Sequence, residues 1–289
     1  MLISGVMVSA TLVSSLIIFL YRNDSLPRFM IVPAELSVPV QDEEQEIPLL
    51  QPEAWQDEEE KIEENLSLGT LAFIIDDAGN NLWELEPFLH FPGPLTIAVL
   101  PGLPNSAEAA QRIRAAGKEV FLHQPMESLG GSYPGPGAIF TGMEEDEIRS
   151  IINDNIDEIW PVAGMNNHEG SRISMDEEIM EIILTICRER DIVYLDSRTT
   201  GETVAPAAAL RLDMRIGERD VFLDNDPDRE SIIGYIKTGL SKAGQNGSAI
   251  MIGHTFTPGL ASLLEEQYSL WITQNFTLST VSELINGLP

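Results

Sequence analysis

The sequence predicts an α/β fold after Gly69, either an irregular (β/α) barrel or a large open α/β sheet. Strand and helix signals alternate from that point to the end of the chain. The strand signals are short, continuous apolar runs, which are typical of parallel strands buried on both faces. Polar residues follow the end of most of these runs, as expected where ligands bind in parallel α/β proteins.

The first predicted strand is Leu71–Asp76, an apolar run that stops at two adjacent carboxylates and is followed by Ala78 and Gly79. An apolar run this short, closed by turn residues, favours a fully buried strand. Further strands are expected at Leu95–Leu100, Glu119–His123, Val162–Asn166, Ile192–Asp196, Val221–Asp224, Ala249–His254 and, on the weakest signal, Phe276–Ser279.

Helical patterns separate these strands. The pattern Asp176–Arg190 begins with acidic residues and ends with basic ones, which matches the helix dipole. Asn105 and Gly117 provide start and stop signals for another helix. In chain order the helices are expected at Asn105–Ala116, Glu144–Ile159, Asp176–Arg190, Asp228–Ala243 and Pro258–Gln274.

Two segments precede the predicted α/β domain, residues 69–289. Residues 2–20 carry no charged side chain, and their length is close to the ~20 residues that cross a bilayer. We expect residues 1–22 to form a transmembrane signal anchor, with a cleaved signal peptide as the main alternative. Residues 23–68 mix prolines with acidic runs, which predicts a disordered acidic linker.

Composition excludes several classes of protein. A formal net charge of −29 argues against a nucleic-acid partner, because phosphate backbones require basic patches. The single cysteine, Cys187, excludes an intramolecular disulfide and a cysteine-rich metal module. The sequence carries no signal for an oligomeric state.

Carboxylates and imidazoles gather at the ends of the predicted strands. Three of the four histidines, His123, His168 and His254, lie there together with Asp76 and Asp77. The ends of parallel strands meet at one edge, and one Asp with two His is a familiar ligand set for Zn²⁺ or another divalent ion. We predict Asp77, His123 and His168 as ligands, Asp76 as general base and His254 as general acid.

Each prediction has a simpler structural alternative. For Asp76 it is a helix or turn cap, and for each histidine it is a hydrogen-bonded structural role. For Asp224 it is an Asx turn, and for the two arginines near strand ends it is an ion pair with a neighbouring carboxylate. Substrate-binding or supporting positions are predicted at Glu127, Asn167, Arg172, Asp196, Arg198 and Asp224.

The chain from Thr70 to Leu284 contains, in order, the motifs IIDDAGNN, PGPLTIAVLP, LHQPME, YPGPGAIFTGM, NNHEGSR, YLDSRT, DVFLDND and AIMIGHT. Together they resemble the divergent polysaccharide deacetylase family. The resemblance implies an irregular (β/α) barrel of the polysaccharide deacetylase type and a metal-dependent chemistry on N-acetylated sugars. It also implies that Asp76 is the base, Asp77 a metal ligand and His254 the acid that assists the leaving group.

The chain departs from the broader deacetylase group in its histidines. That group carries two histidines four residues apart on one loop, whereas here Glu127 follows His123 at that spacing and His168 comes from another strand end. The group's arginine–proline and aspartate–tryptophan motifs are not evident.

The resemblance leads to a functional expectation. We expect a membrane-anchored, extracytoplasmic hydrolase, or one that is secreted or periplasmic after signal cleavage. It would hold a divalent ion, expected to be Zn²⁺, and remove N-acetyl groups from a carbohydrate polymer. The alternatives are a non-catalytic glycan-binding or envelope-organising protein and a hydrolase of a different bond, such as an ester or phosphoester.

Overall fold

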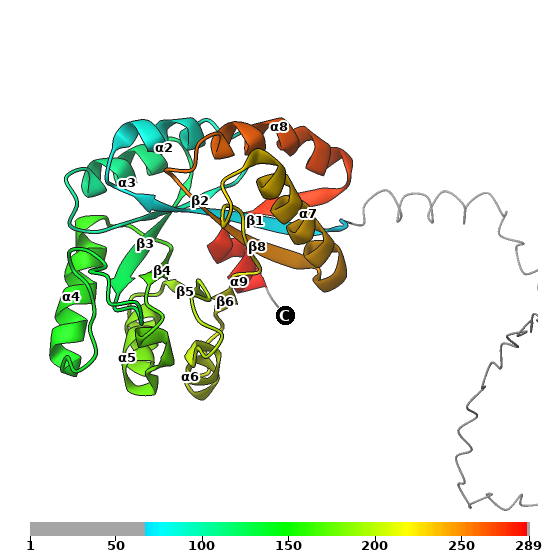
Figure 1. The fold of residues 1–289 in the computed structure, drawn as a ribbon. Coiled ribbons are helices and arrows are strands. Elements are labelled where there is room, and N and C mark those ends of the chain that lie inside the picture. Colours follow the sequence, from blue (N-terminus) through cyan, green and yellow to red (C-terminus); the bar gives the residue numbers. More distant parts are fainter. Residues whose placement is uncertain (1–66, 288–289) are drawn as a thin grey trace, which may run out of the picture. The chain divides into compact units, whose positions relative to one another are not determined.

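The structure is a computed structural model that describes residues 67–287 (Figure 1). The predicted anchor, residues 1–22, lies outside the described residues, as does nearly all of the predicted linker, residues 23–68. Within residues 67–287, no helix is both long enough and apolar enough to cross a membrane.

The described strands alternate with helices along the chain. The strands are β1 (Gly69–Ala78), β2 (Thr96–Val99), β3 (Glu119–Met126), β4 (Gly164–Glu169), β5 (Val193–Asp196), β6 (Gly217–Glu218), β7 (Val221–Phe222), β8 (Ser248–His254) and β9 (Phe276–Ser279). The helices are α2 (Leu82–Leu89), α3 (Ser106–Ala115), α4 (Glu145–Glu158), the 3₁₀ helix η1 (Ile173–Met175), α5 (Glu177–Glu189), α6 (Ala205–Arg211), α7 (Arg229–Asn246), α8 (Leu260–Thr273) and α9 (Val281–Gly287).

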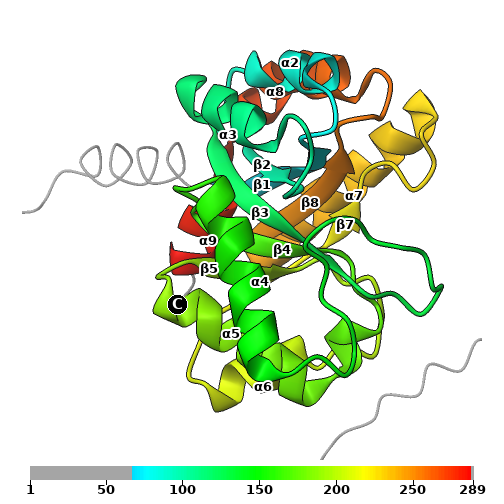
Figure 2. The same cartoon turned by 90° about the vertical axis from the view of Figure 1, so that its left-hand side faces the viewer.

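The strands form one parallel sheet in the order β6-β5-β4-β3-β2-β1-β8-β7, with β9 also paired to β1. The sheet curls into an open half-barrel with helices around its outside, as Figures 1 and 2 show. Its two end strands, β6 and β7, are consecutive in the chain. Arg219 N donates to Asp196 O at 3.0 Å and Asp220 N donates to Ile250 O at 2.8 Å. In a regular barrel the two end strands would be hydrogen-bonded to each other. Here the two residues that connect them, Arg219 and Asp220, span the gap between β6 and β7.

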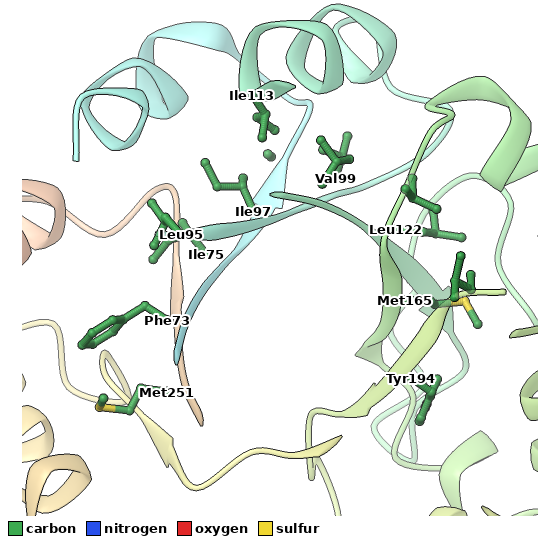
Figure 3. Packing of buried hydrophobic residues seen from close by; sticks show 14 of the residues in the cluster. Phe73, Ile75, Leu95, Ile97, Val99, Ile113, Leu122, Met165, Tyr194 and Met251 are labelled. Atoms are coloured by element: carbon green, nitrogen blue, oxygen red, sulfur yellow. The ribbon is translucent and has the colours of Figure 1, made fainter. Parts of the chain in front are cut away.

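Alternation along each strand separates an outer layer from an inner one. On β1, Leu71, Phe73 and Ile75 belong to the large core between the sheet and the helices, part of which Figure 3 shows. Ala72 and Ile74 belong to a second, smaller core inside the curl. The members of that inner core are Ala72, Ile74, Ala98, Phe121, Leu195, Ile250, Ile252, Val281 and Ile285.

The last helix, α9, covers one end of the inner core. Val281 and Ile285 of α9 are buried in it, and Val281 N donates to the buried Thr96 hydroxyl at 3.0 Å. Phe121 fills the centre because the facing residue is Gly164, where a Cβ would lie 2.3 Å from the Phe121 ring. Apolar side chains therefore fill the inside of the half-barrel at the α9 end. The polar residues lie at the other end, which we call the mouth of the half-barrel.

The structure confirms the predicted parallel α/β class and places a strand at each predicted strand position. It adds five elements that the sequence analysis did not predict: α2, η1, α6, β6 and α9. The first contains Pro87, which masks its helical pattern, and β6 has only two residues, too few to show a period.

Candidate metal and catalytic site

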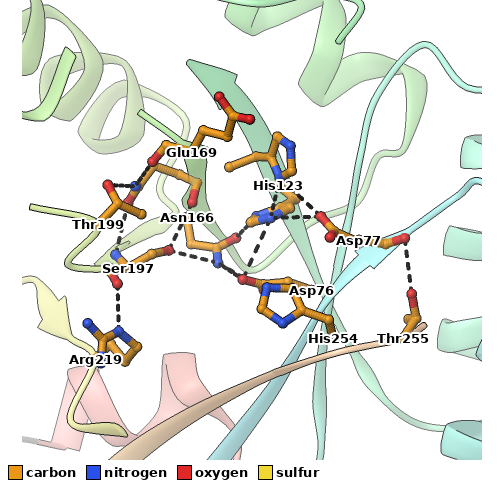
Figure 4. Close-up of polar contacts among 12 residues, drawn as sticks. Asp76, Asp77, His123, Asn166, Glu169, Ser197, Thr199, Arg219, His254 and Thr255 are labelled. Carbon is orange, nitrogen blue, oxygen red and sulfur yellow. Dashed lines mark hydrogen bonds and ion pairs between the residues drawn. The ribbon is translucent and has the colours of Figure 1, made fainter. Parts of the chain in front are cut away.

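The inner-facing series of residues ends in polar groups at the mouth of the half-barrel. In the parallel ladder Ile74 pairs with Ile252, and the next inner pair is Asp76 with His254. On the other side, His123 of β3 pairs with Asn166 of β4. Four strands therefore bring a carboxylate, two imidazoles and an amide to one place (Figure 4).

Asp77 joins this group because β1 carries an extra residue. Between Ile75 and Ala78 the strand advances three residues while β2 advances only from Ile97 to Val99. Asp77 takes a left-handed backbone conformation with φ of 66°. In a regular strand its side chain would point outward, toward the helices. The extra residue forms a β-bulge, which turns the side chain toward the mouth instead. Both aspartates consequently reach His123, whose Nε2 is 3.6 Å from Asp76 Oδ2 and 3.3 Å from Asp77 Oδ1.

Asp77, His123 and His168 form a compact three-residue group. Asp77 Oδ1 lies 3.3 Å from His123 Nε2 and 3.0 Å from His168 Nδ1, and the two nitrogens are 3.2 Å apart. The His123 side chain is buried, whereas Asp77 and His168 are partly exposed, at 16% and 23%. Each residue thus offers one atom to a common point on the partly exposed side of the group.

The three atoms fit a bound divalent ion. Ligands at ~2.0–2.1 Å in tetrahedral geometry are about 3.3 Å apart, close to the three distances observed here. Asp77 Oδ1 is buried and accepts no hydrogen bond of ordinary geometry from any described residue. Burial alone would raise the pKa of Asp77, but His123 and His168 hold it well below its usual range. The group therefore contains an ionised, unsatisfied oxygen facing two imidazole nitrogens, which suits a cation.

Asn166 organises the neighbours of this group. Its Oδ1 lies 2.9 Å from His123 Nδ1, so the imidazole donates this bond and keeps its Nε2 lone pair for a metal. Its Nδ2 donates to Asp76 Oδ1 at 3.0 Å and to Ser197 Oγ at 3.2 Å. Asn166 is fully buried, so one amide fixes both the ring of a candidate ligand and the carboxylate of the candidate base.

Asp76 has the environment of a proton acceptor. Its side chain is only 3% exposed, and burial raises its pKa despite the opposing charges of His123 and His254. A carboxylate with a raised pKa takes up a proton more readily near neutral pH. The predicted base thus lies beside the candidate metal group without being one of its three members.

His254 is held by Asp224. Its Nδ1 lies 3.0 Å from Asp224 Oδ1, and its backbone N–H donates to Asp224 Oδ2 at 2.8 Å. The Thr257 hydroxyl donates to the same carboxylate at 2.5 Å. Burial would lower the pKa of His254, but Asp224 and Asp76 raise it to about 9. His254 is therefore a protonated imidazole with Nδ1 occupied and Nε2 available as a proton donor.

Three other predicted residues connect loops. Asp196 accepts from the Arg198 amide at 2.8 Å and from the Thr203 hydroxyl at 2.7 Å, and Arg198 pairs with Glu218 at 2.5 Å. Asn167 accepts from the Ser197 amide at 2.8 Å. Asn167 and Asp196 are neighbours in sequence of the inner-facing Asn166 and Leu195, so they belong to the outward series and do not join the central group.

Glu127 and Arg172 lie together at the edge of the site. Glu127 accepts from Thr141 N at 2.8 Å and Oγ1 at 2.7 Å, and its other oxygen is 3.0 Å from Arg172 Nε. These contacts attach the long loop between β3 and α4 to the loop that follows β4. Of the predicted positions, the structure thus brings together Asp76, Asp77, His123, His168, Asp224 and His254, and it adds Asn166, which the sequence analysis did not select.

Comparisons with known proteins agree with this architecture. An uncharacterised protein of Agrobacterium tumefaciens C58 shares the fold with a TM-score of 0.71 and 20% identity, covering 75% of this chain and 89% of that one. The uncharacterised protein YibQ of Escherichia coli K12 is 31% identical over 218 residues, 75% of this chain and 68% of that protein.

An uncharacterised protein of Haemophilus influenzae Rd is 30% identical over 184 residues, 64% of this chain and 66% of that protein. The match thus spans about two thirds of the length of these curated relatives. A family model described as divergent polysaccharide deacetylase matches residues 73–285, which include every member of the site described above. The chain therefore belongs to the divergent polysaccharide deacetylase family.

Proposed function

We propose that this protein is a metal-dependent hydrolase that removes N-acetyl groups from an amino-sugar polymer of the cell envelope. One observation carries the proposal: the buried Asp77 Oδ1 faces two imidazole nitrogens and has no hydrogen-bond partner among the described residues. Asp76 and His254, which flank it, supply a base and an acid. Family membership supports the reaction class.

Asp77, His123 and His168 would hold the ion, and Zn²⁺ suits one carboxylate with two imidazoles. The chemistry that a bound divalent ion supplies is polarisation of the acyl carbonyl and a lower pKa for water. Asn166 keeps His123 in the tautomer that presents Nε2, because Nδ1 is engaged at 2.9 Å.

Proton movements fall to Asp76 and His254. Asp76 takes the proton of the attacking water as its oxygen joins the acyl carbon, and burial, which raises the pKa of this carboxyl, favours that uptake. His254 gives the proton on Nε2 to the sugar nitrogen as the carbon–nitrogen bond breaks. Its pKa of about 9 keeps it protonated at neutral pH, and Asp224 fixes the ring through Nδ1. The products are acetate and a free amino sugar.

The place of action is part of the same proposal. A segment at residues 1–22 that anchors the chain, followed by an acidic spacer, would hold the catalytic domain outside the cytoplasm, near an envelope polymer. Cleavage of that segment would instead release a secreted or periplasmic enzyme.

The test is acetate release by the full-length chain, stripped of metal and reloaded with Zn²⁺. Acetylated glucosamine oligomers and peptidoglycan are the substrates, and Asp76→Asn is the matched variant because it preserves shape and removes the base. We expect release by the parent protein and a loss of about 10²–10⁴-fold in kcat for Asp76→Asn. Equal absence of release from both proteins on every substrate would contradict the proposal.

A non-catalytic glycan-binding protein is the second candidate. It is favoured by the absence of the arginine–proline and aspartate–tryptophan motifs of the broader group. Under it, glycan binding would persist without metal and would be insensitive to His254→Ala.

A further inference from the structure

A cavity adjoins the site at the loop that follows His254. It has a volume of about 350 Å³, within the range of small-ligand sites. It lies between the first turns of α2 and the β8–α8 loop. The residues that define its walls include Trp83, Glu84, Pro87, Phe88, Phe256 and Thr257.

Two of these walls are large aromatic rings left open to solvent. Trp83 is 74% exposed and Phe256 is 56% exposed. Leaving such rings uncovered forgoes the stabilisation that their burial would give. Single exposed apolar residues are ordinary, but here two line one hollow, which points to a ligand that covers them.

The cavity adjoins the catalytic group through two of its wall residues. The ring of Phe256 stacks on that of His254 with centroids 5.2 Å apart and an angle of 23° between the planes. Thr257, another wall residue, donates to the Asp224 carboxylate that holds His254. Phe256 therefore contacts both the cavity and the proposed proton donor, which places the cavity within reach of a polymer held at the site.

The wall residues also include hydrogen-bond acceptors. Pro87 lies inside α2 and has no amide hydrogen, so the Trp83 carbonyl lacks the helical bond that residue 87 would otherwise donate. Glu84 adds a carboxylate. Aromatic faces with adjacent acceptors suit a pyranose ring, which has apolar C–H faces and donor hydroxyls at its edge.

We propose that this cavity is a subsite for one sugar ring of the polymer, next to the ring that is deacetylated, with Trp83 and Phe256 as its stacking surfaces. The inference rests on the proposed function and specifies its substrate as a chain of at least two sugars. The cavity would make the enzyme select oligomers over single sugars.

Binding is measured first, because it does not depend on turnover. The full-length chain has four tryptophans, and among those in residues 67–287 Trp83 is the one in the cavity wall. We expect N-acetylglucosamine tetramer to quench tryptophan fluorescence. The matched control is Trp160→Phe, because Trp160 is also exposed, at 48%, but is not in the cavity wall. Trp160→Phe should retain the quench and the affinity, whereas Trp83→Ala should lose the quench and about tenfold in affinity by calorimetry.

Chain-length dependence is measured next. The ratio of kcat/KM for the tetramer to that for the single acetylated sugar should be well above one in the parent protein and should fall about tenfold in Trp83→Ala. Phe256→Leu should also weaken tetramer binding, because a branched aliphatic side chain offers no flat face. Calorimetry and circular dichroism of each variant show whether a loss reflects misfolding.

The outcomes separate the two proposals. Tetramer binding that depends on Trp83 supports the subsite even if no acetate is released, in which case only the proposed hydrolase fails. Acetate release with tetramer affinity unchanged in both Trp83→Ala and Phe256→Leu overturns the subsite and leaves the hydrolase intact. Absence of both tetramer binding and acetate release in the parent protein overturns both.

Discussion

The two histidine groups at the mouth of the half-barrel differ in how completely the protein satisfies them. His254 has its Nδ1 engaged by Asp224, and that carboxylate also accepts from a backbone amide and from Thr257. His123 and His168 instead converge on Asp77 Oδ1, a buried oxygen without a hydrogen bond of ordinary geometry among residues 67–287. Both carboxylate oxygens of the first group are hydrogen-bonded, whereas the second group contains a buried carboxylate oxygen without such a bond in the described part of the chain.

Under the proposed function, this difference suits residues of the same types to separate tasks. A carboxylate–imidazole pair that is fully hydrogen-bonded fixes a proton at one atom, as an acid requires. A carboxylate with two imidazoles, unsatisfied and open on one side, is suited to a metal with exchangeable positions. Matched changes in the two groups should therefore have different consequences.

The largest expected effect follows from Asp77→Asn. Asparagine tolerates the left-handed backbone at this position, where φ is 66°, so the fold should persist. The variant loses the anionic ligand, and we expect it to lose stoichiometric metal and detectable acetate release together. Elemental analysis and an acetate assay measure both. Full metal content in Asp77→Asn would show that the ion, if any, binds elsewhere.

Asp224→Asn makes the same chemical change in the other group. We expect metal content to be retained and kcat to fall by about 10²–10⁴-fold, because the pKa of His254 loses the support of its carboxylate. The decline in rate at alkaline pH, which should lie near pH 9 in the parent protein, should move toward neutrality. An unshifted pH profile would remove Asp224 from the acid's machinery.

Metal should stabilise the fold through the group of Asp77, His123 and His168, and not through Asp224 and His254. Free Zn²⁺ at a hundred times its Kd should raise the free energy of unfolding by about 2.7 kcal/mol. For a domain of this size that corresponds to an increase in Tm of roughly 5–10 °C. Calorimetry should show the increase in the parent protein and in Asp224→Asn, and none in Asp77→Asn. Equal increases in all three would indicate binding outside the site.

Asn166→Leu should weaken the metal group without removing a ligand. The change leaves His123 Nδ1 and the buried Asp76 without the amide partner, at a cost of about 1–3 kcal/mol in unfolding free energy. We expect metal affinity to fall by about 10–100-fold, as measured by competition with a chelator. Unchanged affinity with lowered stability would limit Asn166 to a structural role.

The smallest effect concerns pH and the metal-free protein. The pKa of His254 is raised to about 9 from about 6.5 in the unfolded chain, so its stabilising contribution is complete below pH 6.5. It is lost as the pH rises to about 9, by roughly 1–2 kcal/mol given partial solvent access. Urea titrations at pH 6 and pH 9 should show this loss, and His254→Gln should reduce it. The same loss in both proteins would attribute it to other groups.

The apolar runs and their polar ends were enough to predict the parallel α/β class and the convergence of Asp76, His123, His168 and His254. The expectation that polar residues at the ends of parallel strands meet at one edge does not say on which face of the sheet each side chain lies. Period-two alternation would have supplied it: Asn166 lies two residues before His168 and shares its face, whereas Asn167 and Asp196 belong to the outer series. Applied to β4, that rule identifies Asn166 and sets Asn167 aside.

Other features had no signal in the sequence. The two-residue strand β6 exists because the curled sheet aligns Gly217 with Leu195, a pairing that depends on tertiary structure. The extra residue of β1 likewise has no signal in the sequence, because two adjacent aspartates occur both in regular strands and in bulged ones. Strict alternation would have sent Asp77 to the helical side, so its presence in the metal group is a result of local backbone geometry.

Because Asp77 reaches the mouth only through the extra residue at the end of β1, an Asp-Asp pair in a sequence does not by itself predict this group of residues. A homologue that kept both acids but lost the extra residue at this point would direct one of them out of the mouth, so it would retain the fold and lose the group of Asp77, His123 and His168. Relatives without this group could therefore arise by deletion alone. Recognising them requires aligning the residues on both sides of Asp76 and Asp77 as well as the two acids themselves.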